Sequence, residues 1–104
     1  MESISSSYSV LLSPRAYRDL DDIYLYISST LLEPTIAKQQ IDHIWNAIYS
    51  LSSFPYSHQD RLVGKYANKG YKQLLVDNYI IIYQINEVNE KVVITTIQYI
   101  RRNL

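Results

Sequence analysis

The fold is decided by residues 70–102, which read GYKQLLVDNYIIIYQINEVNEKVVITTIQYIRR. Val, Ile, Leu, Thr and Tyr dominate this stretch, and only Asp77-Asn78 and residues 86–90 interrupt it. Asp and Asn tolerate the left-handed backbone of tight turns, so the pattern predicts three β-strands joined by two short turns. The predicted strands are residues 71–76, 79–85 and 91–100.

Two amphipathic helices are predicted upstream of these strands. In each, apolar side chains recur at spacings of three and four residues, which places them on one helical face. Ser13 and Pro14 suit the start of the first helix, because a Ser side chain accepts from an early backbone N–H and Pro fits the first position. The predicted core residues are Ala16, Leu20, Ile23, Tyr24, Ile27 and Leu31 in the first helix and Ala37, Ile41, Ile44, Trp45, Ile48 and Leu51 in the second.

A short strand at residues 8–12 precedes the helices, and the polar residues 56–69 are predicted to be a loop, so the order is β-α-α-β-β-β. A helical hairpin must bury its apolar face, and the sheet is the only large apolar surface available. The fold class is therefore α+β, with an antiparallel helical hairpin packed on a mainly antiparallel four-stranded sheet. We expect residues 1–7 to be a flexible lead-in and residues 8–104 to form a single domain.

The charges are divided unevenly between the two halves of the chain. Residues 1–60 contain three basic and seven acidic side chains, whereas residues 61–104 contain seven basic and three acidic ones. A positive half can meet nucleic acid or an acidic protein segment. The absence of cysteine excludes disulfide and thiolate chemistry, and no apolar run approaches the ~20 residues of a membrane span.

Two sets of side chains are candidates for binding a target or a protein partner. Arg61, Lys65 and Lys69 lie in the predicted loop, where they form either a solvated surface or a patch for phosphates or an acidic partner. Tyr17 and Tyr26 fall off the apolar face of the first helix. Exposed aromatic side chains are typical of protein interfaces, so either this surface or the continuous apolar strands are expected to be covered by a partner.

No metal or cofactor site is predicted. His43 and His58 are fifteen residues apart and neither has a partner at metal-ligand spacing. Asp19, Asp21 and Asp22 are clustered near the start of a helix, where acidic side chains interact favourably with the helix dipole, and we expect them on a solvated face.

The order of elements and several motifs resemble the RelE/ParE superfamily of bacterial type II toxins, of the plasmid-stabilisation type. Residues 8–16 and 19–24 are similar to that family's first strand and first helix, and Gly70-Tyr71-Lys72, residues 76–83 and residues 92–102 are similar to its sheet. The resemblance implies a small cytoplasmic toxin that inhibits growth, with an antitoxin that wraps and silences it in a hetero-oligomer. It implies no membrane partner and no cofactor.

The resemblance implies two alternative targets. RelE-like members cut mRNA on the ribosome without a metal, and ParE-like members poison DNA gyrase. The long paired helices are closer to the ParE-like branch. A further alternative is a non-toxic binding module that keeps the fold and the antitoxin contact but has lost activity.

Cleavage of mRNA by its 2′-OH needs groups that take a proton, stabilise the phosphorane and protonate the leaving oxygen. The candidates for this chemistry are Arg102, Arg101, Lys72 and Tyr99. The resemblance matches Arg102 to a sheet-rim arginine of the RNA-cutting members and places Lys72 near the strand that supplies their lysines, whereas their late tyrosine has no match here. Two further positions of the RNA-cutting branch carry Leu74 and Ile80 here, so the set is incomplete. Whether the chain is an enzyme therefore stays open. If it is one, it is a metal-independent, ribosome-dependent mRNA endoribonuclease.

Overall fold

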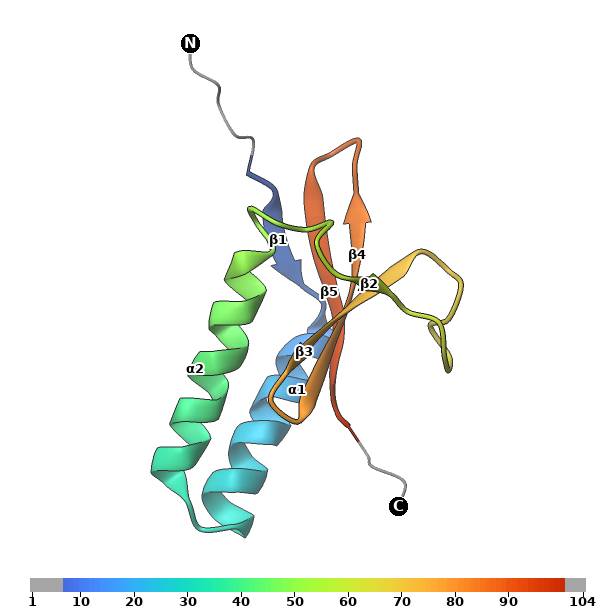
Figure 1. Ribbon diagram of the computed structural model, residues 1–104. Coiled ribbons are helices and arrows are strands. Elements are labelled where there is room, and N and C mark those ends of the chain that lie inside the picture. The colour runs from blue at the N-terminus through green and yellow to red at the C-terminus, as the bar shows by residue number, and fades with distance from the viewer. Residues whose placement is uncertain (1–6, 101–104) are drawn as a thin grey trace.

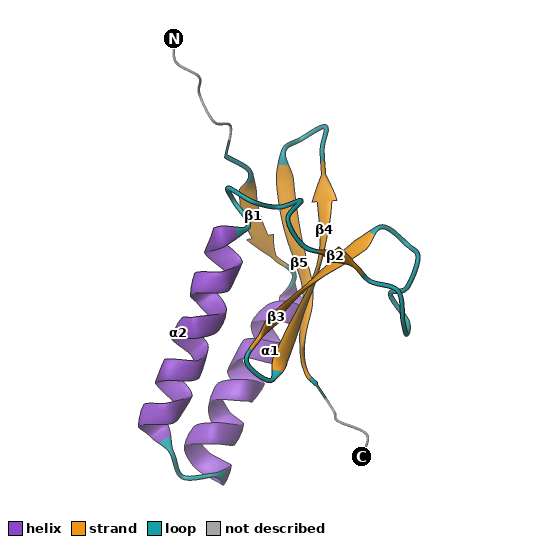
Figure 2. Cartoon of the chain, viewed as in Figure 1, coloured by secondary structure: helices purple, strands orange, loops and turns teal. Residues whose placement is uncertain are grey.

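The computed structural model describes residues 7–100, in which two helices pack on one side of a five-stranded sheet (Figure 1). The elements are β1 (Ser9–Leu12), α1 (Pro14–Leu25), the π-helical turn η1 (Tyr26–Thr30), α2 (Pro34–Ser50), β2 (Gln59–Asp60), β3 (Tyr71–Val76), β4 (Tyr79–Asn86) and β5 (Lys91–Tyr99). The strand order is β1-β5-β4-β3-β2, with β1 parallel to β5 and every other pair antiparallel. Figure 2 shows the two layers that the α+β prediction required.

Helix α1 begins as predicted, with Ser13 as its cap and Pro14 as its first residue. The Ser13 hydroxyl accepts from the backbone N–H of Ala16 at 3.0 Å and donates to the carbonyl of Thr95 at 2.7 Å. Thr95 is the extra residue of a β-bulge, because Ile82 pairs with Thr96 while Tyr83 pairs with Ile94. The helix cap therefore also fastens α1 to an irregular point of the sheet.

The end of the first helix differs from the prediction. The chain widens into η1, in which the N–H of Leu31 donates to the carbonyl of Tyr26, five residues earlier, at 3.0 Å. The wider turn contains one residue more than an α-helical turn, so the side chains that follow it lie on a different side of the axis than in a regular helix. Leu31 is therefore exposed instead of lying in the core. Tyr24, at the margin of the predicted face, is also exposed, so both core assignments were wrong.

Helix α2 and the sheet supply most of the core, which lies on the helix-facing side of the sheet. The fully buried residues include Ile44, Ile48, Leu51, Ile81, Tyr83, Val92 and Ile94. Ile80 and Ile82 are buried as well, although they alternate with Ile81 and so face the opposite side. The continuous apolar run of β4 thus reflects a strand whose side chains are buried on both faces of the sheet, although the helices pack on only one of them.

The turn between β3 and β4 is tied to α2 by one carboxylate. Asp77, at φ 55°, holds the left-handed conformation predicted for this turn. Its Oδ2 accepts from Gln40 Nε2 at 3.0 Å and lies 3.1 Å from His43 Nδ1. These hydrogen bonds, led by that of His43, hold the pKa of the Asp77 carboxyl below its ordinary value. The His43 ring is thereby engaged in a structural contact.

The sheet has one strand more than predicted. Within the predicted loop 56–69, Gln59 and Asp60 form β2 and pair with Gln73 and Lys72 of β3. Both residues of β2 are polar and exposed. Such a short, exposed segment carries no hydrophobic alternation, which is the signal by which strands are found in a sequence.

Asp19 corrects the expectation of a solvated acidic face. Its side chain is only 13% exposed, and its Oδ2 accepts from the Thr96 hydroxyl at 2.6 Å and from the Ile97 N–H at 2.9 Å. Strand β1 ends at Leu12, opposite Ile94, so the edge of β5 beyond that point lacks a neighbouring strand. Asp19 supplies the missing acceptor from the helix, whereas Asp21 and Asp22 are exposed as expected.

Replacing Tyr83 with phenylalanine is expected to destabilise the fold by about 1–2 kcal/mol. The buried Tyr83 hydroxyl donates to the carbonyl of Pro55 at 2.8 Å, and burial raises the pKa of this phenol to about 12, which keeps it a donor. The variant leaves that carbonyl without its partner. Urea unfolding at neutral pH measures the loss, and Tyr17→Phe, at an exposed position, is the matched control. Equal midpoints for the two variants would contradict the prediction.

Candidate functional site

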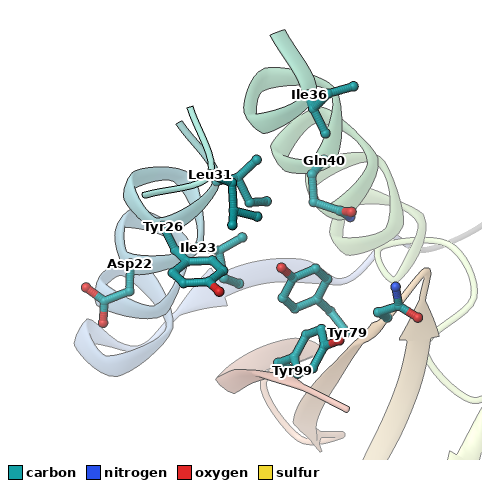
Figure 3. Close-up of a pocket in the computed structure, with 10 residues that line it drawn as sticks. Asp22, Ile23, Tyr26, Leu31, Ile36, Gln40, Tyr79 and Tyr99 are labelled. Atoms are coloured by element: carbon teal, nitrogen blue, oxygen red, sulfur yellow. The ribbon is translucent and has the colours of Figure 1, made fainter. Parts of the chain in front are cut away.

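A cavity of about 620 Å³ opens where the tip of the helical hairpin meets the end of the sheet (Figure 3). Its walls come from the end of α1, from η1, from the first turns of α2 and from the ends of β4 and β5. Figure 3 shows Tyr26 and Tyr79 facing each other from opposite walls, with Leu31 and Ile36 above them. We call this space the tyrosine groove. Its size is that of a binding site for a ligand or for a few side chains of a partner.

The walls of the tyrosine groove are apolar and open to solvent. Tyr26, Leu31, Ile36 and Tyr99 are 48–66% exposed, although each contributes apolar surface to one hollow. The Tyr79 side chain, on the wall opposite Tyr26, is only 8% exposed. Its ring meets the Tyr99 ring edge to face, with the ring centroids 5.6 Å apart. A contiguous exposed apolar hollow of this kind marks an interaction surface.

The π-helical turn explains why this surface exists. The hydrogen bond from Leu31 to Tyr26 closes the wide turn, and Leu32 then adopts φ 57° to begin the link to α2. The turn that removed Leu31 from the core therefore places it on the wall of the groove. Insertions of this type in α-helices are frequent at functional sites. Sequence spacing could not reveal it, because the expected period was that of a regular helix.

The polar groups at the groove are few. Burial raises the pKa of the Tyr79 phenol, and the neighbouring Tyr99 and Tyr26 add to the effect, so the hydroxyl stays protonated at neutral pH. Asp22 lies at the rim and Gln40 on the α2 wall. A partner of the groove is therefore expected to bring apolar side chains and a positive charge near Asp22.

The predicted binding residues Arg61, Lys65 and Lys69 lie together in the segment 61–70, which we call the basic loop. Figure 1 shows this loop projecting away from both helices, between β2 and β3. Lys65 and Lys69 are exposed, and Lys65 Nζ lies 5.7 Å from the centroid of the Tyr66 ring. Arg61 is half-buried, and its Nη1 donates to Gln73 Oε1 at 2.9 Å.

The structure does not bring the two described catalytic candidates together. Tyr99 pairs with Tyr79 of β4, and Lys72 pairs with Tyr83 of the same strand. Because these two partners are four residues apart, the two candidates are separated by about 13 Å in the direction of the strand. Lys72 is 19% exposed, and its Nζ donates to Asp60 Oδ1 at 2.9 Å and to the carbonyl of His58 at 3.1 Å. The positive charge of Lys72 is thus compensated by the carboxylate of Asp60 in β2. Arg101 and Arg102 lie outside the described residues.

The side of the sheet that faces away from the helices, which we call the open face, is reached by two charged groups from outside the sheet, the Arg61 guanidinium at Gln73 and the Asp19 carboxylate at Thr96. Its three central cross-strand rows contain no carboxylate, ammonium or imidazole group. The rows are Tyr71, Gln84 and Val93; Gln73, Ile82 and Thr96; and Leu75, Ile80 and Gln98. Ile80, one of the two positions at which the expected RNA-cutting set is incomplete, is buried in the third row.

Metal chemistry has no support within residues 7–100, where no three His, Cys, Asp or Glu side chains are grouped closely enough to hold an ion. In the same part of the chain, no helix combines the length and the apolar character that crossing a bilayer requires.

Comparison with known proteins identifies relatives of this arrangement. Residues 10–104 match the family described as the ParE toxin of the type II toxin–antitoxin system, parDE. No curated protein matches the chain. A chain of the chromosomal ParDE toxin–antitoxin system from P. aeruginosa superposes with a TM-score of 0.76 at 18% identity, over 93% of this chain and all of that one.

Two further solved structures have the same fold. A chain of the toxin–antitoxin complex RelBE2 from Mycobacterium tuberculosis gives a TM-score of 0.65 at 20% identity, over 94% of this chain and 97% of that one. The isolated RelE toxin from E. coli gives 0.63 at 13% identity, over 93% and 88% of the two chains. At these identities, the similarity establishes the fold.

Proposed function

Because the chain belongs to the family of ParE toxins of type II toxin–antitoxin systems, we propose that it inhibits bacterial growth by acting on DNA gyrase in the cytoplasm. A cognate antitoxin neutralises it by forming a hetero-oligomer. Poisoning of gyrase is the activity of the ParE-like branch that the sequence resembles. The long helical hairpin and the match to the ParE family both support this branch over the RNA-cutting one.

The scarcity of acid–base groups in the central rows of the open face is the observation that carries the choice of target. Cleavage of RNA needs proton transfer to and from the reacting oxygens by groups such as lysine, histidine, carboxylate or tyrosine side chains. Of these, the central rows contain only the Tyr71 phenol. The central rows of the open face offer amide, hydroxyl, phenol and aliphatic side chains. Lys72 lies on the other face, paired with Asp60. The described residues thus favour binding of a target over metal-free RNA cleavage.

The tyrosine groove is the proposed contact surface for the antitoxin. Two of the similar structures are described as toxin–antitoxin assemblies, which supports a partner of this kind. Tyr26, one of the predicted interface residues, forms a wall of the groove. Tyr17, the other, is exposed on α1 outside the groove lining and is proposed as a separate contact. An antitoxin that fills the groove buries the exposed apolar surface at the hairpin tip.

Expression of the chain alone in bacteria tests the proposed function. We expect growth to stop, cells to form filaments and DNA damage to accumulate, and we expect co-expression of a cognate antitoxin to restore growth. Growth arrest with ribosome-dependent cleavage of mRNA would instead assign the chain to the RNA-cutting branch. Unimpaired growth with a good yield of folded protein would contradict toxicity and favour a non-toxic binding module.

A further inference from the structure

We propose that the basic loop and the adjoining open face bind the phosphodiester backbone of a nucleic acid. The proposal concerns a surface on the opposite side of the sheet from the tyrosine groove, and it holds whether gyrase or the ribosome is the target. Both of those targets carry nucleic acid, DNA in one case and RNA in the other. The shared ligand chemistry is a chain of phosphates with accessible bases.

All the charged side chains of the basic loop are positive. Residues 61–76 contain four basic and no acidic side chains. Asp60 compensates Lys72 at 2.9 Å, but no carboxylate within residues 7–100 lies within ion-pair distance of Arg61, Lys65 or Lys69. Three cations on a projecting loop, with no counter-charge among the described residues, attract a polyanion.

The basic loop is a folded element with internal hydrogen bonds. The N–H of Arg61 donates to the carbonyl of Tyr71 at 2.8 Å, and the N–H of Asn68 donates to the carbonyl of Arg61 at 3.0 Å. Gly64, Asn68 and Gly70 hold left-handed conformations that close the loop on itself. The cations are therefore displayed from a defined backbone, which lowers the entropy cost of binding a ligand.

Arg61 connects the loop to the open face. Its Nη1 is held by Gln73, which lies in the central row with Ile82 and Thr96. Its Nε is buried and finds no acceptor within the described residues. The guanidinium thus stands between the lysines of the loop and the amides of the sheet.

The chemistry beside the loop favours a nucleic acid over an acidic protein segment. Gln84 and Gln98 place amide groups on the open face, on β4 and β5, while the Gln73 amide on β3 is engaged by Arg61 and Gln59. Glutamine amides pair with base edges. Tyr66 and Tyr71, with ring centroids 4.9 Å apart, add aromatic surface between the cations. Cations interleaved with aromatic rings are the composition of surfaces that bind single strands.

Fluorescence anisotropy with the purified full chain tests this proposal. The probes are three fluorescein-labelled 16-mers of one sequence: single-stranded RNA, single-stranded DNA and duplex DNA. We expect binding to at least one probe at 50 mM salt. The logarithm of the association constant should fall with the logarithm of salt concentration with a slope of about −2 to −3, one phosphate contact for each cation. The preferred probe identifies the source of the phosphates.

A pair of matched variants makes the test specific. Lys65→Gln with Lys69→Gln is expected to weaken binding at least tenfold and to reduce the salt slope by between one and two. Lys38→Gln with Lys91→Gln removes the same charge elsewhere and should change affinity less than threefold. Three results would overturn the proposal. The unchanged chain could bind none of the three probes at 50 mM salt. The two variant pairs could weaken binding equally, or polyglutamate at the same charge concentration could compete as well as nucleic acid. None of these outcomes bears on inhibition of gyrase, which is assayed separately.

Discussion

Replacing Asp19 with alanine is expected to destabilise the folded chain by about 3 kcal/mol. The carboxylate accepts two hydrogen bonds from β5, from the hydroxyl of Thr96 and from the N–H of Ile97. Thr96 is 1% exposed, so water cannot replace the lost acceptor there. Hydrogen bonds to a charged group are about twice as strong as neutral ones. Urea unfolding at neutral pH, followed by circular dichroism, measures the change.

Two variants separate this structural role from a general effect of charge. Asp22→Ala removes an exposed carboxylate one turn along the same helix and should change the stability by less than about 0.5 kcal/mol. Asp19→Asn keeps one acceptor oxygen without the charge and should fall between the two alanine variants. If Asp19→Ala unfolds at the same urea concentration as Asp22→Ala, the attachment of α1 to the edge of β5 is not what stabilises this side of the fold.

Placing glutamate at both Leu31 and Ile36 is expected to weaken binding of the antitoxin at least about 100-fold, which corresponds to about 3 kcal/mol. Both side chains line the tyrosine groove and are about half exposed in the free chain, so the charges are tolerated until a partner covers them. Burying an unpaired carboxylate is then costly. Calorimetry with the proposed cognate antitoxin measures the affinity.

The same variant has a distinct expected effect in cells. If the groove serves the antitoxin, the double variant stays toxic and co-expression of the antitoxin no longer restores growth. Val88→Glu, at a fully solvated position in the turn between β4 and β5, is the control and should remain neutralised. A double variant that the antitoxin binds as tightly as the unchanged chain would place the antitoxin surface elsewhere.

Local signals explain the parts of the fold that sequence alone predicted correctly. The Ser13-Pro14 helix start and the Asp77-Asn78 turn each depend on a few adjacent residues, and both are present. The predicted limits of β3 coincide with the observed ones, because two strong turn signals bracket a β-forming run. The α2 pattern is also confirmed, since every predicted core position on it is buried or half-buried.

Contacts between distant segments explain the parts that sequence could not supply. The contact between Asp19 and Thr96 spans 77 residues, and nothing near Asp19 distinguishes it from the exposed Asp21 and Asp22. The pairing of Lys72 with Asp60 depends on the two-residue strand β2, which lacks a hydrophobic period.

The candidate site was predictable only in part, for the same reason. The sequence identifies Tyr26 as a candidate because it falls off the apolar face of the first helix, and Tyr99 as a candidate for RNA cleavage. The cavity that they share is assembled from four elements and from a π-helical turn that the regular helical period conceals. The exposed cations of the basic loop, Lys65 and Lys69, follow from their polar, aperiodic surroundings. The fold adds the link from Arg61 to Gln73 and to the amides of the open face.

The most direct test of gyrase inhibition is a supercoiling assay with purified gyrase, relaxed plasmid and the purified chain. We expect the chain to inhibit supercoiling and to trap linear, gyrase-cleaved plasmid. We also expect an equimolar amount of the antitoxin to abolish both effects. Full supercoiling in the presence of excess folded chain, with cleavage of mRNA on translating ribosomes by the same preparation, would show that gyrase is not the target.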